Sequence, residues 1–269
     1  MLKNHLVTGI NTMTYVSNAG VLIQLQDKKI LIDGLCDPNQ PFYKNPPAEI
    51  SAKIKGGMPP FDNIDLMLIT HQHSDHFDPI SIHEFRKRNP NTIILSTSEV
   101  ISKIKTYASD NDAPDTGIMN LEHNLIELKT ALHHAEMLTV KGINIRILSM
   151  LHSGKSYDDV RNFSYLIEYG LRILHVGDAS PVRENYDGQN LRRTKIDWFI
   201  APFPYIALPS ARVVIKEYIN PQKIAIVHLP NEERDRFGWI KATHKSFGKI
   251  EHDFIETIFL EELGSTIGL

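Results

Sequence analysis

The sequence predicts an α+β protein in which two mixed β-sheets pack together and helices flank them. Blocks of short strands and blocks of helices occur twice along the 269 residues in a similar rhythm. Two packed sheets with helices outside bury the apolar faces of all these elements. No internal repeat, low-complexity tract or linker-like change of composition divides the chain. We therefore expect a single domain spanning residues 1–269, with 42% hydrophobic residues to supply its core.

The chain should begin with a strand meander, since three runs rich in Thr, Val, Ile and Leu follow one another: Thr12 to Val16, Gly20 to Leu25 and Lys29 to Ile32. Residues 34–63 are rich in Pro, Gly and Asn, and a loop of that length is more often functional than idle. We expect this loop to form a lid or a pocket wall. Within it, Phe42 and Tyr43 are as much expected to line a pocket as to pack against neighbouring residues.

A β-α-β-α stretch should follow. Its expected elements are a strand at Ile64 to Thr70, a helix from Pro79 to about Lys87, a strand at Asn91 to Leu95 and a helix at Ser98 to Tyr107. Asp78 is placed as the N-cap of the first helix, with Pro79 at its first position. Ser96 and Glu99 have the spacing of a capping box for the second helix.

Strands dominate the next part of the chain. They are expected at Leu125 to Leu128, Met137 to Val140, Ile143 to Leu148, Phe163 to Glu168 and Leu171 to Val176. Two buried strands, Asp197 to Ala201 and Lys223 to Val227, should flank a helix near Ser210 to Ile219, and Asp235 to Phe247 fits a further helix. The tail from Phe254 to Leu269 is ambiguous between strand and helix.

Charge and cysteine content narrow the class of protein. With 29 basic and 32 acidic residues the net charge is −3, so no overall attraction to nucleic acid or anionic membrane is expected. The single cysteine, Cys36, excludes an intrachain disulfide and a Cys-rich zinc module. Residues 1–10 lack the apolar run of a signal peptide, and no later run could span a membrane. We expect a cytoplasmic protein that acts on a small molecule, with homo-oligomerisation left open.

A cluster of metal-binding side chains follows the strand that ends at Thr70. His71, His73, Asp75 and His76 offer three imidazoles and a carboxylate within six positions, and these groups are natural ligands of zinc and similar divalent ions. A loop can turn Asp75 and His76 away from His71 and His73, toward a second ion. The alternative to a metal site is a surface loop with solvated histidines, and it is disfavoured because the cluster directly follows a buried strand.

The segment Thr70 to His76 resembles the His-x-His-x-Asp-His signature of the metallo-β-lactamase superfamily. Four further segments resemble motifs of that family in the right order: Asp33 after Lys-Ile-Leu-Ile, Leu148 to Gly154, Val176 to Ala179, and Ile224 to His228. The similarity is closest to the broad branch of ascorbate-6-phosphate lactonase-like proteins and N-acyl-phosphatidylethanolamine-hydrolysing phospholipase D. Residues Asn162 to Glu168 are typical of this branch.

The resemblance implies a four-layer αβ/βα sandwich, the metallo-β-lactamase fold, with two metal ions at one edge between the sheets. It assigns His71, His73 and His152 to one ion, Asp75, His76 and His228 to the other, and Asp178 to both as a bridge. Without the cluster, His152, His228 and Asp178 would more often be ordinary core, surface or turn residues. Cys36 does not fall at a ligand position, which argues against the antibiotic-hydrolysing subgroup.

The expected function is therefore metal-dependent hydrolysis. Two divalent ions, with Zn²⁺ favoured and Mn²⁺ or Fe²⁺ as alternatives, would activate water as a hydroxide for attack on an ester, lactone, amide or phosphodiester bond. Asp178 would orient the hydroxide and shuttle its proton, with Asp75 as a second candidate catalytic residue. The competing hypotheses are an iron- or manganese-dependent oxidoreductase of the same fold and a metal-binding scaffold without catalysis.

Other polar residues are weaker candidates. His133, His134 and His175 should be structural or exposed, although His175 lies near Asp178 in sequence and could support it. Lys155, Tyr157 and Arg161 follow His152 on a loop and could meet an anionic substrate, but a solvated loop face is the better expectation. Nucleic-acid processing is disfavoured by the net charge and by the lack of an additional domain or basic arm.

Overall fold

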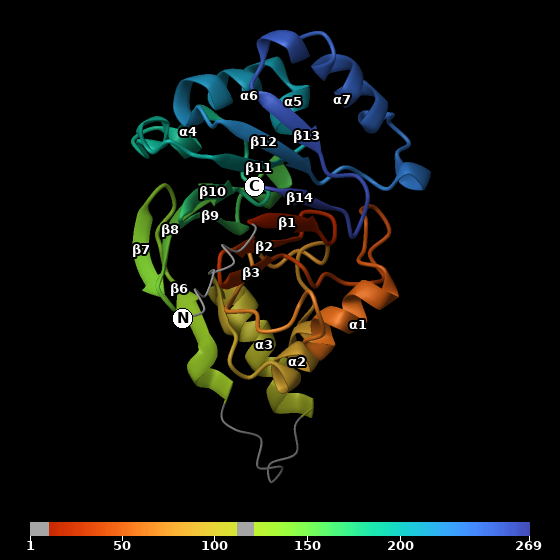
Figure 1. The fold of residues 1–269 in the computed structure, drawn as a ribbon, viewed down its shortest axis with the longest axis vertical. Helices are drawn as coiled ribbons and strands as arrows, with labels where there is room; N and C mark the ends of the chain where they lie inside the picture. The colour runs from red at the N-terminus through yellow and green to blue at the C-terminus, as the bar shows by residue number, and fades with distance from the viewer. Residues whose placement is uncertain (1–10, 112–120) are drawn as a thin grey trace, which may run out of the picture.

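The computed structural model describes residues 11–111 and 121–269. In this part of the chain, two seven-stranded sheets pack against each other and helices cover both outer faces (Figure 1). The helices of the first half of the chain lie below the sheets in the view of Figure 1, and those of the second half lie above them. The predicted four-layer αβ/βα sandwich of two mixed sheets flanked by helices is therefore confirmed.

The first sheet contains the N-terminal meander, with the order β14-β1-β2-β3-β4-β5-β6. Its strands are β1 (Thr12–Tyr15), β2 (Val21–Leu25), β3 (Lys28–Ile32), β4 (Leu66–Leu68), β5 (Ile93–Thr97), β6 (Leu125–Leu128) and β14 (Thr266–Gly268). Strands β1 to β3 pair antiparallel, whereas β3 to β6 pair parallel because long connections cross between them.

The second sheet has the order β13-β12-β11-β10-β9-β8-β7. Its strands are β7 (Ala135–Val140), β8 (Ile143–Leu151), β9 (Arg161–Tyr169), β10 (Leu171–His175), β11 (Trp198–Pro202), β12 (Lys223–Val227) and β13 (Glu256–Phe259). Strands β8 and β10 are both antiparallel to β9, and β10, β11 and β12 are parallel to one another. The carboxyl ends of β8, β10 and β12 therefore lie at the same edge of this sheet.

The helices connect the parallel strands. They are α1 (Ala48–Gly56), α2 (Pro79–Arg88), α3 (Ser98–Asn111), α4 (Arg183–Tyr186), α5 (Pro204–Ala207), α6 (Pro209–Val214), which continues as a π-helical turn over Ile215–Ile219, and α7 (Trp239–Phe247). Among the described residues no helix is long and apolar enough to cross a membrane. The ambiguous tail forms strands β13 and β14, and β14 pairs with β1.

Two local predictions need correction. Residues 34–63 are not one loop, because they contain α1. The Ser96–Glu99 capping box is also wrong, since Ser96 is a residue of β5 whose Oγ donates to the Ile69 carbonyl at 2.8 Å. The first turn of α3 is capped instead by Thr97, whose Oγ1 accepts from the Val100 N–H at 3.3 Å. By contrast Asp78 caps α2 as predicted, accepting hydrogen bonds from the Ile80 and Ser81 N–H groups.

Both faces of the central strands are buried. In β2, Val21 and Ile23 belong to the core between the sheets, whereas Leu22 packs with residues of α1 and α2. In β9, Tyr165 faces the core between the sheets and Leu166 packs under the helices of the second half. Burial of both faces explains why residues 21–23 of β2 and residues 165–167 of β9 are apolar at successive positions. It also leaves the loops at the ends of the strands as the place for polar side chains.

Candidate metal centre

The seven predicted ligands come from four loops that follow strands. His71, His73, Asp75 and His76 lie between β4 and α2, and the other three, His152, Asp178 and His228, follow β8, β10 and β12. Their ligand atoms form two groups, one of His71, His73 and His152 and the other of Asp75, His76, Asp178 and His228. Within each group the ligand atoms lie within 4.8 Å of one another. The structure thus brings together all seven residues from a sequence span of more than 150 positions.

The first group, which we call the three-histidine group, is His71, His73 and His152. His71 Nε2 lies 3.1 Å from His73 Nδ1 and 3.3 Å from His152 Nε2. Burial lowers the pKa of all three imidazoles, and that of His71 falls well below its usual range. All three are therefore neutral near pH 7, which is the form of histidine that binds metal ions.

Hydrogen bonds determine which nitrogen of His71 and His152 carries the proton. The Thr70 hydroxyl gives its single hydrogen to Asp33 Oδ2 at 2.7 Å, so at 3.0 Å it accepts from His71 Nδ1. His152 Nδ1 donates to the Ser153 carbonyl at 2.7 Å. In both neutral rings Nε2 consequently carries a lone pair and no proton. The two lone pairs face each other across 3.3 Å. This arrangement is repulsive unless a cation lies between them, so the donor set fits a metal ion.

The second group, the mixed group, is Asp75, His76, Asp178 and His228. His228 Nε2 lies 3.2 Å from Asp75 Oδ2 and 3.1 Å from Asp178 Oδ2, and His76 Nε2 lies 3.3 Å from Asp178 Oδ1. Three of these buried atoms, His76 Nε2, His228 Nε2 and Asp178 Oδ1, have no hydrogen-bond partner among the described residues. Buried polar atoms are rarely left so, and convergent oxygen and nitrogen atoms without partners suit a divalent ion.

The two buried carboxylates of the mixed group need a positive charge nearby to stay ionised. Burial raises the pKa of Asp178, but His228 and His76 outweigh it and hold that pKa well below its usual range. Burial lowers the pKa of His228, but Asp178 and Asp75 outweigh it and raise it to about 9. Without a metal ion, protons on His228 and His76 supply the charge that the carboxylates require.

Asp178 lies between the two groups. Its Oδ2 is 3.6 Å from His152 Nε2 of the three-histidine group and 3.1 Å from His228 Nε2 of the mixed group. The turn that carries it is tightly held, because the Asp178 N–H donates to Asn162 Oδ1 at 3.0 Å. Gly177 before it has φ +55°, and an added Cβ would lie 2.6 Å from that same Asn162 oxygen. Asp178 thus occupies the position that a bridging ligand needs.

A set of buried residues orients the candidate ligands. Asp33 accepts from the Thr70 N–H at 2.8 Å and from His76 Nδ1 at 2.8 Å. Asn18 Nδ2 donates to Asp75 Oδ2 at 2.9 Å. His175 is buried, donates to the Ala19 carbonyl and accepts from the Gly177 N–H, so it supports the Asp178 turn. His133 and His134 are exposed, as expected.

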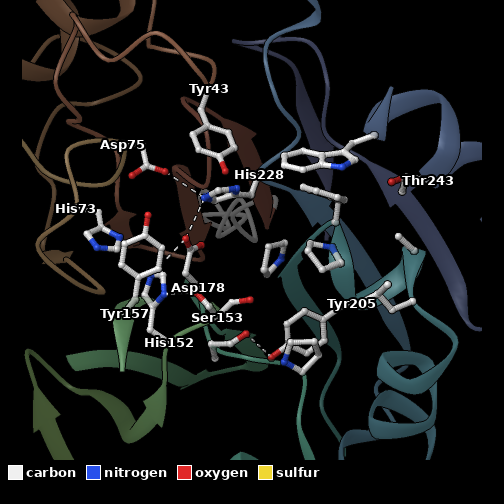
Figure 2. A pocket seen from close by; sticks show the side chains of 18 of the residues that line it. Tyr43, His73, Asp75, His152, Ser153, Tyr157, Asp178, Tyr205, His228 and Thr243 are labelled. Atoms are coloured by element: carbon white, nitrogen blue, oxygen red, sulfur yellow. Dashed lines mark hydrogen bonds and ion pairs between the residues drawn. The ribbon is translucent and has the colours of Figure 1, made fainter. Parts of the chain in front are cut away.

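A cavity of about 570 Å³ opens beside both groups. Figure 2 shows His73, Asp75, His152, Asp178 and His228 gathered on one side of it. Tyr43 and Tyr157 also line the cavity, and the Tyr157 ring packs edge-on against His73 and His152. Phe42 does not line it and is 65% exposed. The predicted pocket wall in residues 34–63 is therefore represented by Tyr43 alone among the residues that line this cavity.

Sequence reasoning missed part of the site. Asn18 lies in a Ser-Asn-Ala-Gly turn that carries no metal motif, and its contact with Asp75 joins residues 57 positions apart. Asn162 belongs to the family-like segment Asn162 to Glu168, but no sequence pattern indicates its bond to the Asp178 N–H. The apolar side of the cavity, which includes Phe203, Leu208 and Trp239, has no sequence signature. Of the two basic candidates, neither Lys155 nor Arg161 lines the cavity.

A family model described as a beta-lactamase superfamily domain matches residues 12–205. The chain belongs to the metallo-β-lactamase superfamily. Several solved structures share this superfamily fold at low sequence identity. A metallo-hydrolase from the archaeon Ignicoccus hospitalis is 16% identical, with 97% of this chain and 99% of that chain covered and a TM-score of 0.63. The comparison with curated proteins finds no match.

Two other solved structures with this fold have names that give different reactions. An isothiocyanate hydrolase from Delia radicum gut bacteria is 15% identical, with 96% of this chain and 99% of that chain covered and a TM-score of 0.61. A diiron β-hydroxylase from Streptomyces venezuelae is 14% identical, with 97% of this chain but 54% of that chain covered and a TM-score of 0.59. Identities this low show the shared fold of the superfamily and no common reaction.

Proposed function

We propose that this protein is a hydrolase that uses two divalent metal ions to cleave an ester, lactone, amide or phosphodiester bond of a small molecule. The observation that carries the proposal is the pair of bare Nε2 atoms of His71 and His152, 3.3 Å apart beside an open cavity. His71, His73 and His152 would hold one ion, Asp75, His76 and His228 the other, and Asp178 both. Zn²⁺ is the favoured metal, since the ligands are imidazoles and carboxylates.

When bound, two such ions lower the pKa of water toward neutrality and polarise the acyl or phosphoryl oxygen under attack. The protein's own groups then position the reactants. Asp178 stays ionised and borders the cavity, so its carboxylate can accept a proton from the attacking water and pass it to the leaving group. Asp75 borders the same cavity and is held in place by Asn18 and His228.

Tyr43 is suited to hydrogen-bond the substrate. Its ring packs edge-on against His228 with the ring centres 4.1 Å apart, and in Figure 2 its hydroxyl points toward His228 and the interior of the cavity. Burial and the nearby Asp178 and Asp75 raise the pKa of Tyr43 well above its usual value. The hydroxyl therefore keeps its proton near neutral pH and can donate a hydrogen bond to an oxygen that gains negative charge during the reaction.

The decisive experiment combines metal content with activity for Asp178→Asn. Elemental analysis of the wild-type protein should find two divalent ions per chain, and a panel of lactones, carboxylic esters, amides and phosphodiesters should include at least one hydrolysed substrate. Asp178→Asn should lose at least one ion and most of that activity, by about 10³-fold or more. Asp187→Asn, which alters an exposed carboxylate outside the cavity, is the matched control. Two ions and full activity in Asp178→Asn would refute the proposal.

We also propose a branch of the superfamily for this protein. The segment Asn162 to Glu168 supports a place near the ascorbate-6-phosphate lactonase-like and phospholipase D-like proteins. Asn162 and Ser164 in that segment both donate to the Val176 carbonyl, and Asn162 also accepts from the Asp178 N–H. The segment thus serves to hold the Asp178 turn, which gives a physical reason for its residue types.

An iron- or manganese-dependent oxidoreductase is the second candidate. Histidine and carboxylate ligands suit Fe²⁺ and Mn²⁺ as well as Zn²⁺, and the fold is shared with a diiron hydroxylase. This candidate predicts iron in the protein as purified, visible absorption bands and consumption of oxygen. Full hydrolytic activity after reconstitution with Zn²⁺ alone would decide against it, because zinc has no redox chemistry.

A further inference from the structure

The cavity beside the candidate metal centre has two chemically different sides. Metal-binding side chains and Ser153 form one side, and Figure 2 shows them apart from Tyr205 and Thr243 on the other. The second side, which we call the apolar chamber, is walled mainly by prolines and large apolar residues: Pro181, Pro202, Phe203, Pro204, Leu208 and Trp239. A bound molecule that reaches the metal centre therefore extends toward an apolar surface.

The chamber presents no cationic side chain to an anion. Among the described residues that line the cavity there is no lysine or arginine, and the carboxylates and imidazoles there are those of the candidate metal centre. Pro181, Pro202 and Pro204 also lack a backbone N–H, so this part of the wall cannot donate through the main chain. An anionic substituent placed here would lose its hydration without gaining a cationic partner.

The one phenol of the chamber is turned to the protein. The Tyr205 hydroxyl donates to the Ala179 carbonyl at 2.9 Å and is also hydrogen-bonded to the Tyr186 hydroxyl. Tyr205 is fully buried among its neighbours. Its polar atom is therefore already satisfied, and Tyr205 borders the cavity without a free hydrogen-bonding group.

Hydrogen bonds among α5, α6 and α7, and at the start of α7, hold the wall of the chamber in place without a bound molecule. Arg212 Nη1 donates to the Ile206 carbonyl at 2.7 Å and to Ser246 Oγ, and Ser246 Oγ donates to the Ala207 carbonyl at 3.0 Å. At the start of α7, Asp235 accepts hydrogen bonds from the Trp239 and Ile240 N–H groups at 2.8 and 2.9 Å. These bonds hold both walls of the chamber before any molecule enters.

Large apolar side chains remain exposed at the mouth of the chamber. Leu208 is 47% exposed and Trp239 is 43% exposed, although both line the cavity. The Trp239 ring lies 5.8 Å from that of Phe203 and at 32° to it, so the two rings form one continuous surface. An apolar group that covers this surface removes it from water, which is the main source of affinity in such sites.

From these observations we infer that the substrate carries an uncharged apolar substituent, an alkyl chain or an unsubstituted ring, which occupies the chamber while the bond to be cleaved lies at the metal centre. This inference rests on the proposed hydrolase function and deepens it by naming the class of substrate. It concerns the substituent and not the scissile group, because a charge on the scissile group would lie beside the metal ions.

Lactones with one side chain test the inference directly. In the metal-loaded protein, kcat/KM should rise from γ-valerolactone through γ-heptalactone to γ-nonalactone by about threefold per added methylene, as expected for alkyl groups leaving water. A γ-lactone with a 4-carboxybutyl side chain, equal in length to the pentyl chain of γ-nonalactone, should be at least tenfold poorer than γ-nonalactone. Equal or better hydrolysis of the carboxylate-tailed lactone would overturn the inference.

Variants locate the effect. Trp239→Ala and, as a second surface variant that should fold normally, Leu208→Ala should each lower the ratio of kcat/KM for γ-nonalactone to that for γ-valerolactone by about tenfold. The matched control is Phe237→Ala, because Phe237 is 78% exposed and stacks on Trp239 but does not line the cavity. This control should keep the wild-type ratio. An unchanged ratio in both chamber variants would contradict the assignment of the substituent to the chamber.

Binding without turnover separates this inference from the proposed function. Isothermal titration of the metal-free protein should show that 2-pentyltetrahydrofuran binds at least tenfold more tightly than the same cyclic ether with a 4-carboxybutyl chain. If no lactone is hydrolysed although two ions are bound, the lactone part of the proposed function fails, while this preference still supports the chamber. Equal binding of the two ethers would overturn the chamber inference, whatever the enzyme hydrolyses.

Discussion

Asp33 Oδ2 accepts a hydrogen bond of 2.8 Å from Nδ1 of His76, so the residue that follows β3 is joined to the loop that carries four candidate metal ligands. The other oxygen of Asp33 accepts from the Thr70 N–H at 2.8 Å. Both side chains of the pair are fully buried. One carboxylate thus sets the ring orientation of His76 and the course of the backbone where the ligand loop begins.

Asp33→Asn should therefore weaken metal binding and the fold together. An amide in this place puts N–H groups against donors, which costs roughly 1–3 kcal/mol of unfolding free energy for each buried group left unpaired. Metal affinity should fall by about 10- to 100-fold, as for other supporting residues of metal ligands. Urea denaturation of the metal-free protein and competition with a fluorescent chelator measure the two effects. Asp62→Asn, at a partly exposed ion pair with Lys29, should cost less than about 1 kcal/mol.

The two ligand groups should differ in the protons that they release. Burial lowers the pKa values of His71, His73 and His152, so the three-histidine group should bind its ion near pH 7 without losing a proton. The pKa of His76 is raised well above its usual range and that of His228 to about 9, so an ion in the mixed group should displace up to two protons. Calorimetric titration with Zn²⁺ in buffers of different ionisation enthalpy counts these protons. Equal release at both steps would contradict this difference.

The raised pKa of His228 also predicts how the stability of the metal-free protein depends on pH. Because the pKa of His228 is raised from 6.5 to about 9, its pairing with Asp178 and Asp75 stabilises the fold fully below pH 6.5. That contribution is lost as the pH rises from 6.5 through 9, since the folded state then releases a proton that the unfolded state has already lost. Thermal unfolding of the chelator-treated protein between pH 6 and pH 10 should show a falling midpoint. In His228→Gln this part of the fall should be absent.

Tyr43→Phe isolates the proposed hydrogen bond to the substrate. The variant keeps the ring against His228 and removes only the hydroxyl, so metal content and unfolding midpoint should stay unchanged. If the hydroxyl stabilises charge in the transition state, kcat should fall by about 10- to 100-fold with a much smaller change in KM. Steady-state kinetics on any substrate found in the hydrolysis panel gives both values. A change in KM alone would assign Tyr43 to substrate binding only.

Gly177→Ala tests how tightly the Asp178 turn is packed. An alanine Cβ at this position would lie 2.6 Å from Asn162 Oδ1 and 2.7 Å from Thr70 Cβ, and φ is +55°. Gly188 is a matched control, since it also has a positive φ, +74°, but an added Cβ would meet nothing within 4 Å. Gly188→Ala should cost about 1 kcal/mol for the backbone alone, and Gly177→Ala roughly 1–3 kcal/mol more for the clash. Urea denaturation compares the two, and equal losses would contradict the close packing.

Much of the fold could be predicted because local patterns decide it. The runs at Lys28–Ile32 and Lys223–Val227 form strands β3 and β12, and the Asp78–Pro79 pair opens α2, since each depends on residues within a few positions. Predictions failed where a nearby residue could do the same task. Ser96 and Thr97 are both suited to cap α3, and the pleat of β5 turns Ser96 toward Ile69 and leaves Thr97 for the helix.

The candidate ligands were predictable for a related reason. Four of them, His71, His73, Asp75 and His76, lie within six positions. The others belong to segments that the family resemblance assigns to a metal site at one edge between the sheets. Their roles as ligands stay a prediction that metal analysis must test. What the sequence by itself determined is thus the sandwich and the types of side chain available at its edge.

Only the tertiary structure decided how those side chains are divided, supported and shielded. The facing lone pairs of His71 and His152 join residues 81 positions apart, and Asn18 reaches Asp75 across 57. The apolar chamber forms because α5 and α7, which are separated in sequence, pack side by side and bring Phe203 against Trp239. Contacts of this kind depend on the pairing of whole strands and helices. No local pattern of residues records them, and for that reason the substituent of the substrate could be inferred only from the folded protein.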